Sequence, residues 1–152
     1  MRQWGPFLLL LGLLWVFSSL LFSSDATGRV FFPALEKLFP TIPAAELRHL
    51  HFWIRKLGHV CVYFVLSLVL LRALRHDRPG WEFSTGLRVI GLVAVIAFLD
   101  ELHQFFVPGR GASVKDMVLD SAAAALAQLF AWRRARRQSR LLEGRRSTET
   151  AD

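Results

Sequence analysis

The chain has 152 residues, of which 53% are hydrophobic, and carries a formal net charge of +7. A length of this order suits a single domain, and a mean hydropathy of +0.37 is too apolar for an ordinary soluble domain. The positive charge alone would suit a nucleic-acid-binding protein. The basic residues, however, flank long apolar segments, as charges that border membrane spans do. Composition therefore indicates an integral membrane protein and excludes nucleic acid as the expected partner.

Residues 4–22 form the first apolar segment and contain no charged residue. At about 1.5 Å per residue, a helix of this length matches a hydrocarbon core of roughly 30 Å. A cleaved signal peptide is the alternative, because Arg2 supplies a basic start and Ser24-Asp25-Ala26 is a poor but conceivable cleavage site. The apolar stretches of signal peptides run to only about 7–15 residues. We therefore predict an uncleaved transmembrane helix.

Residues 23–55 form the longest polar stretch, and three prolines divide it into short pieces. After the last of them, Pro43, apolar residues recur at helical spacing. This pattern predicts a short extracytoplasmic amphipathic helix that lies on the membrane and leads into the second span. The residues that define the pattern are Leu47, Leu50, Trp53, Ile54 and Leu57.

Three further apolar segments, residues 56–74, 87–106 and 116–132, complete a predicted all-α bundle of four transmembrane helices within one domain, residues 1–132. The fourth segment is short, and its stretch from Ser121 to Ala127 consists of small residues, which allow helices to approach closely in a membrane. Residues 133–152 form a basic tail. We expect this tail to be disordered or to lie on the lipid surface.

The distribution of Lys and Arg predicts the orientation. With four spans, the N-terminus, the loop between the second and third spans and the C-terminal tail share one side, which carries twelve of the 19 Lys and Arg residues. Positive charge concentrates on the cytoplasmic side of a membrane. We therefore predict a multi-pass protein with cytoplasmic N- and C-termini, in which residues 23–55 and 107–115 face outward.

Polar residues within the last three spans gather at the ends predicted to face outward. Intervals of three or four residues recur in each group, and this spacing places side chains on one helix face. Because these helix ends meet at the same side of the membrane, we expect the groups to form one cluster. They are Lys56, His59 and Tyr63, then Asp100, Glu101, His103 and Gln104, then Asp116 and Asp120.

Ionised side chains at membrane depth cost about 2.5–3.5 kcal/mol each on insertion scales. Asp100 and Glu101 are therefore expected to face inward. Their candidate partners are Lys56, His59 and Arg110, and without a partner they would be protonated. Such carboxylates suit a general acid or base, but an ion-pair network that only joins the helices has the same pattern. Whether the protein is an enzyme stays open at this point.

The connection between the third and fourth spans carries two local signals. Residues 107–110, Val-Pro-Gly-Arg, are typical of a type II turn. Ser113 begins a capping-box pattern that ends at Asp116. The histidines and acids show no recognised spacing of metal ligands, and no nucleotide-binding loop or serine-nucleophile motif occurs. We therefore predict neither a metal nor a cofactor.

Taken together, these residues resemble the VanZ-like family over about residues 55–128. Members of that family are small multi-pass bacterial membrane proteins, so the resemblance implies the bacterial cytoplasmic membrane. The founding member is associated with resistance to the glycopeptide teicoplanin. The fourth span departs from the family pattern, because small residues follow Asp120 where an Asn and a Gly-rich stretch are expected. The matching pattern reads Lys56-x-x-His59-x-x-x-Tyr63, then Asp100-Glu101-x-x-Gln104-x-Phe106-x-Pro108-Gly109-Arg110-x-x-Ser113-x-x-Asp116-x-x-x-Asp120.

Three functions fit this pattern. The first is a cell-envelope protein that binds an anionic or polar headgroup, such as a lipid-linked cell-wall precursor or a lipoglycopeptide, with membrane lipids as its other partners. The second is an intramembrane hydrolase or transferase with Asp100, Glu101 and His59 as catalytic residues. The third is a structural module whose polar residues only join the helices. The expected ligand-binding residues are Lys56, Tyr63, Gln104, Arg110, Ser113, Asp116 and Asp120.

Overall fold

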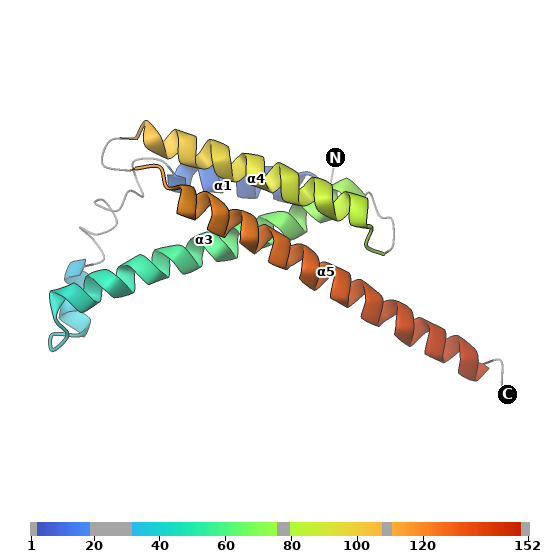
Figure 1. Cartoon of the computed structure of the whole chain (residues 1–152). Helices are drawn as coiled ribbons and strands as arrows, with labels where there is room; N and C mark the ends of the chain where they lie inside the picture. The colour runs from blue at the N-terminus through green and yellow to red at the C-terminus, as the bar shows by residue number, and fades with distance from the viewer. Residues whose placement is uncertain (1–2, 19–31, 76–79, 108–110, 150–152) are drawn as a thin grey trace.

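A computed structural model describes residues 3–18, 32–75, 80–107 and 111–149 of the protein. Over these residues the chain is all-α, without a β-strand, as predicted. A short helix, residues 32–38, precedes the second of the longer ones. Figure 1 shows the longer helices, which are α1 (Gly5–Ser18), α3 (Ala44–Arg75), α4 (Phe83–Phe105) and α5 (Val114–Glu149).

Two of these helices, α3 and α4, are long and apolar enough to cross a membrane. α1 is equally apolar in character, but its described part is only 14 residues long. The apolar section of α5 is short, because Asp116 and Asp120 precede it and arginines follow from Arg133. The all-α class is therefore confirmed, and the number of four spans stays a prediction.

The predicted surface helix and the second span form one continuous helix, α3, rather than two helices. Pro43 lies just before α3, and no proline interrupts the 32 residues that follow. The carbonyl oxygen of Pro43 accepts hydrogen bonds from the backbone N–H groups of Glu46 and Leu47. Near its start, α3 contacts the preceding short helix through the His51 and Phe32 rings, whose centroids are 5.2 Å apart. The expected amphipathic segment is thus the first part of α3.

The basic tail also differs from the expectation of disorder, because α5 continues as a helix to Glu149. Residues 133–149 contain no proline and only one glycine, and Arg, Ala, Leu, Gln and Glu are strong helix formers. A helix that has already been nucleated within the bundle extends through such residues at little cost. In Figure 1 this part of α5 projects away from the other helices.

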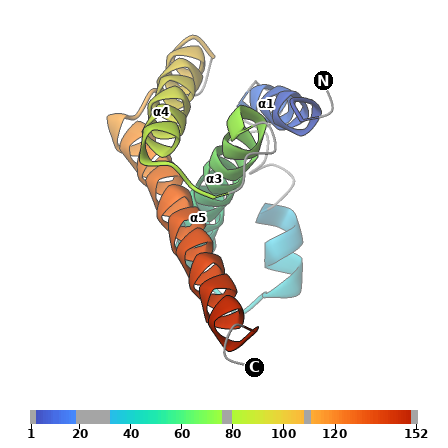
Figure 2. The same cartoon turned by 90° about the vertical axis from the view of Figure 1, so that its right-hand side faces the viewer.

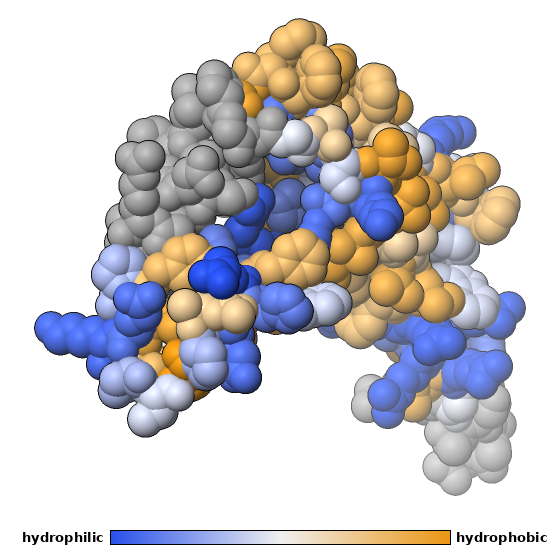
Figure 3. Space-filling model, turned by 60° about the vertical axis from the view of Figure 1, so that its left-hand side comes forward, coloured by the Kyte–Doolittle hydropathy of each residue, from blue (hydrophilic) through white to orange (hydrophobic). Residues whose placement is uncertain are grey.

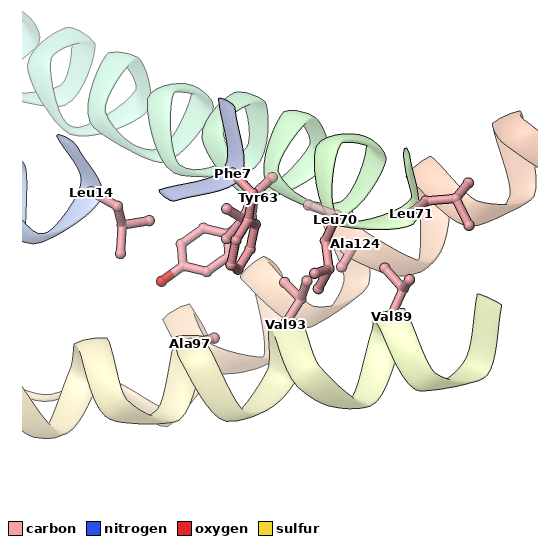
Figure 4. Close-up of a cluster of buried hydrophobic side chains, with 11 residues drawn as sticks. Phe7, Leu14, Tyr63, Leu70, Leu71, Val89, Val93, Ala97 and Ala124 are labelled. Atoms are coloured by element: carbon pink, nitrogen blue, oxygen red, sulfur yellow. The ribbon is translucent and has the colours of Figure 1, made fainter. Parts of the chain in front are cut away.

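The core lies where α3, α4 and α5 pack against one another, with α1 against α3 and α4. Figure 2 shows α1 on the opposite side of α3 from α5. Ala97 of α4 and Ala124 of α5 are fully buried beside Val93, as Figure 4 shows. The small residues predicted to allow close packing therefore do so on one face of α5, which also buries Ala123 and Ala127.

Large apolar side chains cover the outward faces of the same helices. Trp15 of α1, Phe98 of α4 and Phe130 of α5 are each at least half exposed. A soluble monomer rarely exposes contiguous apolar surface on this scale, whereas a lipid-facing helix does so throughout its length. The outer surface of the bundle therefore suits a hydrocarbon environment.

Candidate functional site

Two side-chain pairs join the middle of α3 to the start of α5, one between a lysine and an aspartate and one between a histidine and an aspartate. Lys56 Nζ donates to Asp116 Oδ1, and both side chains are about one-fifth exposed. One turn further along each helix, His59 Nδ1 lies 3.3 Å from Asp120 Oδ2, and the Asp120 side chain is fully buried. The two pairs follow the same register because Lys56 and His59 are three residues apart and the aspartates are four apart. They fix the rotation of α5 against α3.

A third polar contact joins α3 to α4 through Asp100. The Tyr63 hydroxyl donates to Asp100 Oδ2 over 3.2 Å, and Gln104 Nε2, one turn along α4, donates to the same oxygen over 2.8 Å. All three side chains are buried. Figure 4 shows that the Tyr63 ring belongs to the apolar core while its hydroxyl points out of that group of side chains. Tyr63 therefore marks the boundary between the core and the polar site.

Ser113 caps the start of α5 and is itself bound by Glu101 of α4. Ser113 Oγ accepts a hydrogen bond from the Asp116 backbone N–H over 3.3 Å, which is the first half of the predicted capping box. In the second half, the Asp116 side chain would bind the Ser113 N–H. Glu101 of α4 takes this role instead, since its Oε2 accepts from the Ser113 N–H over 2.5 Å. This exchange leaves the Asp116 carboxylate available for Lys56.

These contacts revise the predicted pairing. Lys56 and His59 were expected to neutralise Asp100 and Glu101 of α4, but both bind aspartates of α5 instead. Sequence spacing predicts which side chains share a helix face, but it does not predict how far each helix is rotated against its neighbours. Arg110, the third predicted partner, and the turn of residues 108–110 lie outside the described residues. The other predicted site residues come together, and we call them the charged cluster: Lys56, His59, Tyr63, Asp100, Glu101, Gln104, Ser113, Asp116 and Asp120.

Three carboxylate oxygens of the charged cluster are buried without a hydrogen-bond partner. They are Asp100 Oδ1, Glu101 Oε1 and Asp120 Oδ1, and the side chains that carry them are at most 5% exposed. Each unpaired buried polar group costs about 1–3 kcal/mol. Figure 3 shows hydrophilic side chains gathered in a hollow that is bordered by hydrophobic ones. The cluster therefore has acceptors in excess of its donors.

His103 lies beside the charged cluster and has a different neighbour. Its ring contacts the Trp15 ring of α1, with centroids 4.3 Å apart. This contact joins α1 to α4 near the end of α4 that carries Glu101. Within the described residues, no group of three or more His, Cys, Asp or Glu side chains is arranged to hold a metal ion.

A second polar cluster, which the sequence analysis missed, lies deeper in the bundle. Gln128 Nε2 of α5 donates to Ser67 Oγ of α3 over 2.9 Å, and Ser67 Oγ donates to the Ala124 carbonyl oxygen over 3.1 Å. Trp81 Nε1 donates to Gln128 Oε1 over 3.1 Å. We call Ser67, Trp81 and Gln128 the amide cluster. A signal was present in the sequence: Ser67 continues the face of Tyr63 one turn further, and Gln128 lies two turns beyond Asp120.

The fold and both clusters describe a helical protein adapted to lipid: apolar outward faces, two helices of membrane length and polar side chains paired between helices. The class is therefore a membrane protein. A comparison with protein families agrees with this class: the family model described as VanZ/LLP1 matches residues 7–135, and the chain belongs to this family. The match covers α1, α3, α4 and the first part of α5, and it confirms the resemblance seen in the sequence. No match was found among curated proteins or among solved structures.

Proposed function

We propose that this VanZ-family protein crosses the bacterial cytoplasmic membrane four times and binds the polar headgroup of a lipid-linked cell-wall component or a lipoglycopeptide at its charged cluster. In this topology α1 and α5 supply the first and fourth spans, both termini are cytoplasmic and the charged cluster faces outward. The positions of basic residues support this orientation. Arg72 lies in the last turn of α3 and Arg88 lies near the start of α4, at the end of the bundle opposite to the charged cluster.

The observation that carries the proposal is the set of three buried, unpaired carboxylate oxygens. Four carboxylates, those of Asp100, Glu101, Asp116 and Asp120, meet only two described basic side chains, Lys56 and His59. A ligand that donates hydrogen bonds, through hydroxyl or ammonium groups, would satisfy these oxygens. Headgroups of cell-wall intermediates and of lipoglycopeptides carry such donors beside their anionic groups. Lys56 and Arg110 are the basic side chains that would bind an anionic part.

The accessibility of the cluster also supports ligand binding. Lys56, His59 and Asp116 are each about one-fifth exposed, whereas Asp120 behind them is fully buried. A headgroup can therefore approach from the exposed side while its acyl chains lie along the apolar outer faces of the helices. The entrance to such a site is at the level of the headgroups, and its deeper part holds the acids.

Mass spectrometry of lipids that co-purify with the protein tests the proposal. The variants are Glu101→Gln and Asp120→Asn, which keep side-chain volume and replace a carboxylate oxygen with an amide donor. Glu82→Gln is the matched control, because the Glu82 carboxylate is exposed and, among the described residues, accepts from the Thr85 hydroxyl alone. We expect the wild-type and control proteins to retain the same polar amphiphile, and the two site variants to retain about a tenth or less.

Equal retention by all four proteins, with unchanged thermal unfolding in detergent, would contradict the proposal. A parallel titration with purified teicoplanin tests the lipoglycopeptide branch and the link to glycopeptide resistance that the resemblance implies. Binding to the wild-type protein and loss in Glu101→Gln is the expected result.

A second function is favoured by the His59–Asp120 pair. His59 is about one-fifth exposed and contacts a buried aspartate. Enzymes use this arrangement for general acid–base catalysis. An intramembrane hydrolase or transferase would use His59 to move a proton at the headgroup, with Asp120 as the residue that orients the ring. If the His59→Ala variant folds and binds the ligand but does not convert it to product, the result favours the enzyme. Loss of folding in both His59→Ala and Glu101→Gln would favour a purely structural module.

A further inference from the structure

Beyond the apolar section of α5, four arginines recur on one side of the helix. Arg133, Arg136, Arg137 and Arg140 follow the spacing of adjacent helical turns. All four are exposed, and between Asp120 and Glu143 the sequence contains no acidic residue. Like charges at this spacing repel each other and destabilise an isolated helix. A helix with this face therefore gains stability from an anionic partner.

The arginines line a shallow groove together with Trp132. The groove has a volume of about 250 Å³ and is lined by Trp132, Arg133, Arg136, Arg137 and Arg140; we call it the tryptophan–arginine groove. The Arg136 guanidinium lies over the Trp132 ring, 4.6 Å from its centroid. This contact holds the guanidinium against the ring, and its N–H groups are the donors that would bind a ligand.

Trp132 is itself held in place by the amide cluster. Its ring contacts that of Trp81, with centroids 6.5 Å apart, and Trp81 donates to Gln128. One wall of the groove is therefore fixed by the bundle. The other four residues belong to the part of α5 that leaves the bundle, as Figure 1 shows.

The groove lies at the boundary between apolar and charged surface. Leu129 and Phe130, within one turn before it, are 40% and 50% exposed and suit acyl chains. Tryptophan side chains concentrate at the level of lipid headgroups. The guanidinium groups that follow are thus placed where lipid phosphates lie, and the planar fork of arginine matches phosphate oxygens.

We propose that the tryptophan–arginine groove binds the phosphate headgroup of an anionic phospholipid. The four arginines extend over about 10 Å along the helix at 1.5 Å per residue. This length accommodates two phosphates side by side, so a lipid with two phosphates binds more tightly than a lipid with one. The groove itself is formed by residues of α5, and the inference does not depend on what the charged cluster binds.

Native mass spectrometry of the full-length protein in detergent tests the proposal. The protein is titrated with cardiolipin, phosphatidylglycerol and phosphatidylcholine. The groove variant is the double substitution Arg136→Gln and Arg140→Gln. The matched control is Arg72→Gln with Arg88→Gln, which removes the same charge from exposed positions on α3 and α4. Circular dichroism checks that both variants stay folded.

We expect the wild-type protein to prefer cardiolipin over phosphatidylglycerol and to bind phosphatidylcholine least. The groove variant should lose about tenfold in affinity for both anionic lipids, and the control less than about twofold. An equal loss in the two variants would overturn the proposal in favour of general charge attraction. Displacement of the lipid by inorganic phosphate at millimolar concentration would also overturn it, because the groove would then select a free anion. If the groove variant still prefers the anionic lipids over phosphatidylcholine as strongly as the wild type does, the proposal is also overturned.

Discussion

The charged cluster and the amide cluster both join α3 to α5 through buried polar side chains, yet they are built differently. The amide cluster is neutral, and its Ser67, Trp81 and Gln128 side chains are paired with one another or with backbone. The charged cluster combines the Lys56–Asp116 ion pair and the His59–Asp120 contact with three carboxylate oxygens that lack partners. A fully paired neutral network makes a bundle more rigid. A network with unpaired acceptors lowers the free energy of unfolding instead. The comparison supports the proposal that the first cluster is structural and that the second binds a ligand.

The largest expected effect on stability is at Gly86, whose lack of a side chain leaves room for Trp81 of the amide cluster. A Cβ atom at Gly86 would overlap the indole ring of Trp81, and that ring is held by Gln128 and Trp132. Gly86→Leu should therefore lower the free energy of unfolding in detergent by about 3 kcal/mol or more. Gly91→Leu is the control, since nothing lies near a Cβ atom at Gly91 on the same helix. Equal stability of the two variants would show that Trp81 is not fixed as described.

Gln128→Ala should have the next largest effect, about 2–3 kcal/mol of unfolding free energy. The substitution leaves Trp81 Nε1 without its acceptor and opens a void beside Ser67. Gln138→Ala, at an exposed position of α5, should change stability by less than about 0.5 kcal/mol. Headgroup binding at the charged cluster should be unchanged after Gln128→Ala at temperatures where the protein stays folded. Selective loss of binding would mean that the two clusters are not separate in function.

The contrast between the clusters also shows what sequence can and cannot predict. The spacing of Lys56, His59 and Tyr63 predicted a shared face, and Ser113 predicted a helix start, because both are local properties of one helix. The pairing of Lys56 with Asp116 depends on the rotation of α5 against α3, which no local pattern specifies. Gln128 was missed because its two-turn spacing from Asp120 does not show which residues of other helices it meets. Its meaning comes from Ser67 and Trp81 on other parts of the chain.

The Lys56–Asp116 pair should contribute less than the amide cluster. Both side chains are about one-fifth exposed, and ion pairs that are accessible to solvent are worth little. In a double-mutant cycle with Lys56→Met and Asp116→Asn, we expect a coupling free energy of about 1 kcal/mol, measured by thermal or denaturant unfolding in detergent. A coupling above about 3 kcal/mol would move this pair from the binding role to the structural one. That result would remove the main difference between the two clusters.

The smallest expected effect sharpens the comparison within the charged cluster itself. Ser113→Ala removes the oxygen that accepts from the Asp116 N–H, but the Ser113 backbone N–H still reaches Glu101. Loss of a helix cap of this kind costs about 1 kcal/mol, whereas Ser139→Ala, in the exposed part of α5, should cost less than about 0.5 kcal/mol. Because Glu101 keeps its position, Ser113→Ala should leave headgroup binding within about twofold of wild type. If binding falls as far as in Glu101→Gln, Ser113 contacts the ligand directly. The residue that caps α5 is then also part of the binding site.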